Sequence, residues 1–156
     1  MGGNSENQPA QQRRGFAFGS ECIFCKIVAG GLPGEIVDSD ERTVAFMDIN
    51  PSTRGHALVV PREHSTDLMD ISDEDLAACN LAARRLAARM DATLEPDGFN
   101  VLNACRPAAW QTVFHFHVHV IPRYRDDPLK LPWIPRGAEP ADIAAVAARI
   151  RDGDPS

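Results

Sequence analysis

Three histidines alternate with apolar residues between His115 and Val120. A β-strand places alternate side chains on opposite faces, so His115, His117 and His119 should share one face while the residues between them enter the core. Neighbouring members would lie about 6.6 Å apart and the outer pair about 13 Å apart. One ion can therefore bind two of them but not comfortably all three. A single histidine on a strand is usually structural, but three of the chain's five on one face indicate chemistry or metal binding.

Two of the four cysteines, Cys22 and Cys25, are separated by two residues. A structural zinc ion takes four nitrogen or sulfur ligands, and His64 and His115 are better candidates for the other two than the remaining cysteines. The pair could instead be reduced and unliganded, or a redox motif, although redox motifs prefer a thioredoxin-like βαβ setting that the pattern lacks. A zinc ion saturated by protein ligands stabilises structure and does not activate water. The last two histidines of the strand would then remain for other chemistry.

The elements that position these residues indicate an α+β domain. A long helix should begin at Ser72 as N-cap and run to about Met90, and a last helix should run from Pro140 through Ile150. Five short strands, bounded by turn residues or proline, are predicted over 35–38, 43–47, 56–60, 99–102 and 113–121. Because most strands follow one another directly, an antiparallel sheet is favoured over a doubly wound parallel one.

The length and net charge of the chain limit the classes of protein to which it can belong. The chain has 156 residues and a formal net charge of −6 at pH 7, which fits one domain with its own core and does not favour a protein that binds nucleic acid. Residues 1–20 are expected to form a disordered tail ahead of a domain over 21–156. No signal-peptide pattern and no long apolar stretch is visible, so we expect a cytoplasmic protein without membrane contact.

The motifs together resemble the histidine triad (HIT) family over nearly all of 21–151. The triad stands at 115–121 as His-Phe-His-Val-His-Val-Ile, and 22–27, Cys-Ile-Phe-Cys-Lys-Ile, is similar to the opening of the zinc-bearing members. Two further segments, 45–51 and 55–64, also resemble the family, and Gln-Thr-Val precedes the triad. The resemblance implies a HIT-type antiparallel sheet built as a homodimer, with a structural zinc ion. In members with the complete metal set, the first triad histidine is the fourth ligand.

The resemblance also implies an activity: hydrolysis or transfer of nucleotidyl groups on purine nucleoside phosphoramidates or dinucleoside polyphosphates, derivatives of adenosine or guanosine phosphate. His117 would attack the α-phosphorus and form a nucleotidyl-histidine that water hydrolyses. As an imidazolium, His119 could donate a proton to the leaving group. The other ring nitrogen of His117 needs an acceptor, which we expect to be a backbone carbonyl. His56 has no part in this scheme and is interpreted as structural.

Nucleotide contacts follow from the same resemblance. Asp48 would hydrogen-bond the ribose hydroxyls. The side chains expected to wall the base are Ile23, Phe24, Ile27, Phe46 and Ile49. Those expected to contact the phosphate are Asn103, Gln111, Thr112 and His119. Backbone N–H groups on the turn around Gln111 could meet the charge on the phosphoryl oxygens.

The loop before the triad departs from the family pattern. Trp110 stands where a glycine is expected, and Arg106-Pro107 replace another small, flexible pair. A glycine lets backbone approach phosphate closely. Trp110 could narrow the pocket, stack on a leaving group or pack under the loop, so the substitution leaves the natural leaving group open.

Two other functions compete with this interpretation. In a metal-activated hydrolase, His115 and His117 would bind a catalytic zinc with an open coordination position and activate water directly. Alternatively, the domain could be a nucleotide-binding adaptor module without significant turnover.

Overall fold

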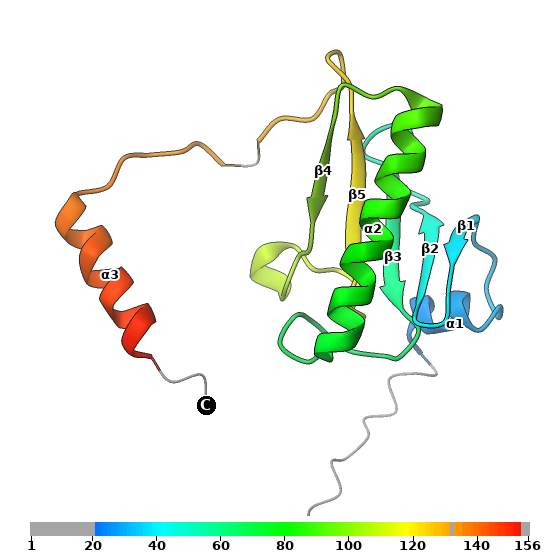
Figure 1. The fold of residues 1–156 in the computed structure, drawn as a ribbon, viewed down its shortest axis with the longest axis horizontal. Coiled ribbons are helices and arrows are strands. Elements are labelled where there is room, and N and C mark those ends of the chain that lie inside the picture. The colour runs from blue at the N-terminus through cyan, green and yellow to red at the C-terminus, as the bar shows by residue number, and fades with distance from the viewer. Residues whose placement is uncertain (1–20, 132, 154–156) are drawn as a thin grey trace, which may run out of the picture.

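The structure is a computed structural model that describes residues 21–131 and 133–153; the predicted tail over 1–20 lies outside them. Over these residues the chain forms a five-stranded antiparallel sheet in the order β1-β2-β3-β5-β4 (Figure 1). The elements in chain order are α1 (Ile23–Val28), β1 (Ile36–Ser39), β2 (Thr43–Met47), β3 (Ala57–Pro61), α2 (Asp73–Leu94), β4 (Gly98–Leu102), the 3-10 helix η1 (Pro107–Ala109), β5 (Val118–Arg123) and α3 (Pro140–Asp152). The predicted α+β class, with one long helix and a C-terminal helix, is confirmed.

The two faces of the sheet are covered by different helices. On one face, Ala45, Ala57 and Val59 join the core formed with α2. On the other face, Val44 and Phe46 pack with Phe24 of α1. This division follows from the alternation of side chains along β2 and β3. A side chain of β5 that points toward α1 therefore lies in the layer where a ligand-binding cleft can form.

The long helix α2 begins where its capping residue predicts. The hydroxyl of Ser72 accepts a hydrogen bond from the N–H of Asp75 at 3.2 Å, which satisfies one of the free donors of the first turn. Four acidic or capping residues precede the apolar stripe, and Cys79, Leu86 and Met90 of that stripe are buried against the sheet. Cys79 is thus a small apolar core residue, as helices commonly use cysteine.

The histidine strand is shorter than predicted. β5 begins at Val118, so His115 and His117 precede the sheet and only His119 lies within it. The reason is that the N–H of Phe116 donates to the carbonyl of Ser65, at 2.7 Å, rather than to a neighbouring strand. The side chains still alternate in direction along this segment, because Phe116, Val118 and Val120 all enter the core under α2.

A tight turn ahead of β3 requires its glycine. Gly55 has φ +93°, a conformation that L side chains rarely adopt, and a Cβ there would lie 2.6 Å from Cδ1 of Leu94. The turn leads directly into His56 and then β3, which pairs with β5 so that Leu58 lies opposite His119. This register brings His56 next to the histidine strand.

The C-terminal helix α3 lies apart from the sheet and α2 (Figure 1). It confirms the helix predicted over 140–150. In the described part of the chain, no helix combines the length and apolarity that crossing a membrane requires.

Candidate active site and metal-binding cluster

The four predicted zinc ligands come together at one end of the sheet. Cys22 and Cys25 lie at the start of α1, His64 follows β3 and His115 precedes β5. The four ligand atoms all lie within 4.8 Å of one another. Nδ1 of His115 is 3.5 Å from Sγ of Cys22 and 3.4 Å from Sγ of Cys25, and Nδ1 of His64 is 3.3 Å from Sγ of Cys25. Loops far apart in the sequence thus converge on one point.

These separations fit a zinc ion. With the usual zinc–sulfur and zinc–nitrogen bond lengths, neighbouring ligand atoms of a tetrahedron are roughly 3.3–3.8 Å apart. Nε2 of His115 lies 2.9 Å from the carbonyl oxygen of Pro61, which can only accept, so this nitrogen carries the proton and Nδ1 is free to bind a metal. Burial lowers the pKa of His115 to about 4, which keeps the ring neutral. Donor types, distances and tautomer all suit a structural site.

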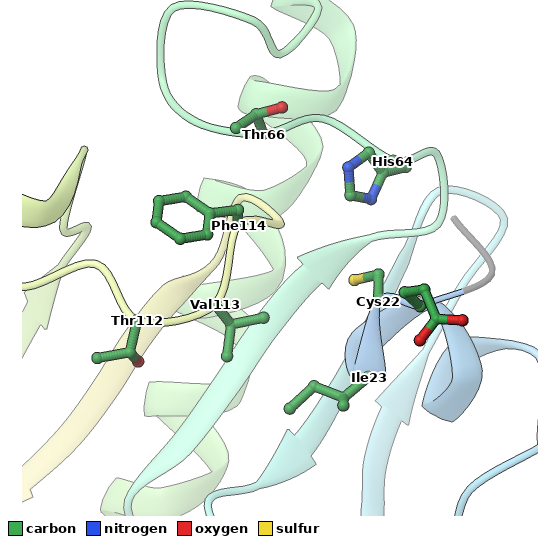
Figure 2. Close-up of a pocket in the computed structure, with 8 residues that line it drawn as sticks. Cys22, Ile23, His64, Thr66, Thr112, Val113 and Phe114 are labelled. Carbon is green, nitrogen blue, oxygen red and sulfur yellow. The ribbon is translucent and has the colours of Figure 1, made fainter. Parts of the chain in front are cut away.

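The outer side of the cluster borders a cavity of about 460 Å³ (Figure 2). Cys22 and His64 face it from one side, and Val113 and Phe114 from the other. His115 in contrast is fully buried. The cluster is therefore reachable from solvent on the side of Cys22 and His64, while its innermost ligand is sealed in the core.

A second cavity, of about 420 Å³, opens on the α1 face of the sheet. Its lining includes nine of the residues expected to contact a nucleotide: Ile23, Phe24, Ile27, Phe46, Asp48, Ile49, Thr112, His117 and His119. Such a cleft, mostly apolar with a few convergent polar groups, has the form of a small-molecule site.

Two expected phosphate contacts, Asn103 and Gln111, do not line this cleft. The side-chain amide of Asn103 donates to the carbonyl of His117 at 2.8 Å. Gln111 is buried; its amide donates to the carbonyl of Thr66 at 2.7 Å, and its oxygen accepts from the N–H of Arg106 at 2.6 Å. Both side chains hold the loop before the triad in place, and their direct contact with phosphate remains a prediction.

His117 has the tautomer that a nucleophile needs. Its Nδ1 lies 2.7 Å from the carbonyl oxygen of His115, so Nδ1 carries the proton and donates, and the lone pair is on Nε2. Burial lowers the pKa of His117, which favours the neutral ring. Phe24 packs edge-on against the imidazole, with ring centroids 5.2 Å apart. The acceptor expected from the sequence is thus the carbonyl two residues earlier.

His56, which the sequence led us to interpret as structural, lies in the site. Its Nδ1 accepts from the N–H of Ser52 at 3.1 Å, so the neutral ring carries its proton on Nε2. That nitrogen is 2.9 Å from Nδ1 of His119 and 3.6 Å from a carboxylate oxygen of Asp48. His56 therefore donates to His119, which leaves the N–H of His119 on Nε2. The sequence carries no local signal for this contact, because only the β3–β5 register creates it.

The pocket disfavours a positive charge on His119. Burial, together with the neighbouring His117 and His56, lowers its pKa to about 4. The imidazolium form considered from the sequence therefore needs an anion beside the ring, because desolvation and two further imidazoles oppose the charge. A neutral His119 still presents an N–H.

The loop before the triad contains the residues that depart from the family pattern, Arg106, Pro107 and Trp110. Arg106 and Trp110 both have left-handed backbone, with φ of 73° and 69°, positions that glycine adopts more easily. The side chain of Trp110 is 64% exposed, so it does not pack under the loop. Within the described residues, the N–H groups of Thr112 and Val113 have no hydrogen-bond acceptor. Both residues line the cleft, and backbone donors without an acceptor suit an anion.

The arrangement does not favour a catalytic zinc shared by His115 and His117. Nδ1 of His115 faces the cysteines and Nδ1 of His117 is bound to a carbonyl. Among the described residues, the groups that could hold a metal are the Cys/His cluster and a set formed by Asp48, His56 and His119, and neither contains His117.

Comparisons with known proteins find relatives in sequence and in fold. The pattern of the HIT domain family matches residues 30–126. "Protein hit" of Bacillus subtilis is 43% identical over 103 residues, 66% of this chain and 71% of that protein. The solved structure of SMU.412c from Streptococcus mutans has a TM-score of 0.82 at 33% identity and covers 91% of this chain and 89% of its own. A zinc-bound histidine triad family protein from Mycobacterium smegmatis has a TM-score of 0.69 at 39% identity, over 76% of this chain and 86% of its own.

Proposed function

Since the chain belongs to the HIT domain family, we propose that it is a nucleotide hydrolase or nucleotidyl transferase acting at the α-phosphorus of purine nucleoside phosphoramidates or dinucleoside polyphosphates. The observation that carries the proposal is the environment of His117. Its proton is held on Nδ1 by a carbonyl, its lone pair is on Nε2, and its ring lines a cleft that also contains Asp48 and apolar walls. A neutral, oriented imidazole next to a nucleoside-sized cleft is suited to nucleophilic catalysis on phosphorus.

In the first step, Nε2 of His117 forms a bond to the α-phosphorus as the bond to the leaving group breaks. The phosphate anion beside His119 favours the protonated form of that ring, and its extra proton passes to the leaving group. In the second step, the oxygen of a water molecule bonds to the phosphorus of the nucleotidyl-histidine, the phosphorus–nitrogen bond breaks and a proton of that water passes to His119. In the ring before it is protonated, the hydrogen bond from His56 to Nδ1 of His119 directs the other nitrogen, Nε2, toward the cleft.

The remaining contacts fix the nucleotide. The apolar side chains Ile23, Phe24, Ile27, Phe46 and Ile49 wall the base. The carboxylate of Asp48 accepts from the ribose hydroxyls. The free N–H groups of Thr112 and Val113, with the side chains of Thr112 and His119, meet the phosphoryl oxygens. Asn103 and Gln111 keep that loop in shape.

The proposed cofactor is a structural zinc ion held by Cys22, Cys25, His64 and His115. When bound, the ion supplies a cross-link between the start of α1 and the two loops and no catalytic step. Its position explains why α1, which carries part of the base wall, can stay on the sheet although it has only six residues.

The proposal also includes an oligomeric state and a cellular compartment. The chain acts as a homodimer: β4 is an edge strand in the described sheet, and Val101 and Leu102 on it are exposed, an edge that proteins commonly cover. None of the four cysteines, all within the described residues, forms a disulfide, which suits a reducing compartment such as the cytoplasm.

A trapping experiment tests the reaction directly. Wild-type protein is mixed with a nucleoside phosphoramidate, quenched within one turnover and analysed by peptide mass spectrometry. We expect a nucleotidyl adduct on His117 in the wild type and none in His117→Ala, which should still bind nucleoside monophosphate. Turnover without any adduct, or an adduct on another residue, would overturn the proposal.

The adaptor function remains the second candidate, because the cleft would bind a nucleotide with or without chemistry. It would gain support if the wild type bound nucleoside monophosphate but converted neither phosphoramidates nor dinucleoside polyphosphates.

A further inference from the structure

The cavity of about 460 Å³ beside the metal cluster is bordered by exposed apolar side chains (Figure 2). Ile23 and Phe114, which both line it, are 47% and 50% exposed. Cys22 and His64 of the cluster form another part of the lining. Exposed apolar residues gathered around one hollow commonly mark a place where another group binds. The cavity therefore has the character of a docking site.

The proposed reaction does not use this cavity. Neither His117 nor His119 lines it, and Asp48 also lies outside its lining. It nevertheless shares Ile23 and Val113 with the nucleotide cleft. A group bound in the cavity would thus be separate from the reacting atoms but in contact with residues that also form the wall of the cleft.

The described chain begins at the rim of the same cavity. Glu21, Cys22 and Ile23 are its first three residues, and all three line the cavity. A fully extended chain advances at most about 3.6 Å per residue, so the Cα of Phe18 can be no farther than about 11 Å from the Cα of Glu21. A segment attached at such short range has an effective concentration on the order of millimolar, which favours it over a free partner.

The segment that precedes Glu21 contains a short apolar group. Phe16 and Phe18 are the aromatic residues of the first 20, in a stretch otherwise rich in Gly, Gln, Asn and Ser. Residues two apart point to the same side of an extended chain, so both rings can enter one hollow. Aromatic rings bury more apolar surface than most side chains and can anchor a short segment. The attachment and composition of this segment thus match the cavity.

Charges around the cavity favour the same segment. Arg13 and Arg14 come just before it in the sequence. On the domain, Glu21 lines the cavity, and the exposed Glu63 precedes the cluster residue His64. Opposite charges on two surfaces favour and orient their association. The two arginines are only a few residues from the rings, so they can reach these carboxylates.

We propose that residues 15–20 dock in this cavity and that Phe16 and Phe18 fill it. The rings pack on the exposed sides of Ile23 and Phe114 and cover the two cluster residues that are reachable from solvent there. The tail expected from the sequence then extends only to residue 14. The docked segment shields the metal cluster from thiol reagents and chelators. This inference does not depend on the proposed reaction.

Nuclear magnetic resonance on the full-length chain tests the docking directly. With selectively labelled phenylalanine, we expect contacts from the rings of Phe16 and Phe18 to the methyl groups of Ile23 and Val113, and these contacts should persist on dilution. Rings without contacts to the domain would overturn the proposal. Contacts that disappear on dilution in parallel with dimer dissociation would also overturn it, because they would assign the cavity to a second copy.

Thiol alkylation measures the consequence for the cluster. Phe16→Ala/Phe18→Ala should increase the alkylation rate of Cys22 about tenfold, since only undocked chains react and docking holds their fraction on the order of one tenth. Peptide mass spectrometry gives the rate for each cysteine. Cys105, half-buried and outside the cluster, is an internal control whose rate should not change. The measurement needs no nucleotide, so a failure of the proposed reaction would not affect it.

A second variant pair separates the apolar group from the rest of the tail. Gln11→Ala/Gln12→Ala replaces two polar side chains ahead of the arginines and should leave the alkylation rate of Cys22 unchanged. Equal acceleration by both pairs, or no acceleration by the phenylalanine pair, would contradict the docking of the two rings.

Discussion

At the level of single residues, the site depends on which ring nitrogen of each histidine carries its proton. A carbonyl fixes this for His115 and His117, since a carbonyl can only accept. A backbone N–H fixes it for His56, and His56 in turn fixes it for His119. Four imidazoles that look alike in the sequence thus acquire different roles from their neighbours.

His56 should affect turnover rather than binding. His56→Ala removes the hydrogen bond that orients His119, so we expect kcat to fall about 10²-fold, within the range found for general acids. KM and the affinity for nucleoside monophosphate should change less than twofold, because His56 does not line the cleft. Steady-state kinetics with a phosphoramidate measure kcat and KM, and calorimetry measures the affinity for nucleoside monophosphate. Unchanged kcat would contradict a positioning role.

The depressed pKa of His119 should make the fold sensitive to mild acid. Its pKa falls from the ordinary value of 6.5 to about 4 on folding. As pH drops below 6.5, the unfolded chain binds a proton that the folded chain does not, so the free energy of unfolding should decrease between pH 6.5 and about 4 and level off below. Denaturant titrations at a series of pH values give the free energy of unfolding of the wild type and of His119→Asn. Over this pH window the free energy of the variant should depend less on pH than that of the wild type. Parallel curves would show that His119 does not contribute.

At the level of elements, α1 and the β3–β5 pair do most of the positioning. α1 and its N-cap carry two cysteines of the Cys/His cluster and three side chains that line the cleft. The β3–β5 register supplies the contact between His56 and His119. A substitution that shifts either element should therefore alter the geometry of the site even when it replaces no residue that lines the cleft.

The metal cluster should hold α1 in place. Cys22→Ser removes one sulfur ligand, and we expect zinc content to fall below the one ion per chain predicted for the wild type, with a melting temperature lower by several degrees. Elemental analysis and calorimetry measure the two quantities. The matched control is Cys105→Ser, a half-buried thiol outside the cluster, which should change neither. A Cys22→Ser protein as stable as the control would argue against a structural zinc.

The turn before β3 should not tolerate a side chain at position 55. Gly55→Ala would place a Cβ 2.6 Å from Leu94 and 3.1 Å from Pro122 in a backbone conformation with φ +93°, so we expect a loss of about 1–3 kcal/mol in the free energy of unfolding. Gly98→Ala is the control, because nothing lies within 4 Å of its added Cβ. Urea denaturation compares the two. Equal stabilities would mean that the turn relaxes without cost.

At the level of the whole molecule, the open edge of β4 in the described sheet and the exposed apolar residues of α3 both favour association. We expect the 17.0 kDa chain to sediment as a dimer. Val101→Lys places a charge on the exposed edge strand and should shift the population toward monomer, since an inward or edge charge is a common way of blocking strand association. Analytical ultracentrifugation measures this; a wild type that stays monomeric at all accessible concentrations would contradict the dimer.

Much of this protein was readable from its residues alone. The α+β class, both long helices and the four residues of the metal cluster follow from periodicity, capping and ligand chemistry, which are local properties. Strand spacing predicts that one ion cannot bind all three triad histidines. In the structure His115 lies in the Cys/His cluster and the other two line the cleft, although the strand itself begins only at Val118.

Other features were decided only by tertiary structure. The partnership of His56 with His119, the use of Gln111 and Asn103 to hold the loop, and the neutral state of His119 all depend on groups distant in the chain. So does the bare face of α3, since an apolar stripe in a sequence does not say whether its own domain covers it. These features share one physical reason. The sheet register and the packing of the loops decide which segments meet, and this decides the hydrogen-bond partners and the desolvation of each group. A pattern of residue types does not encode that register.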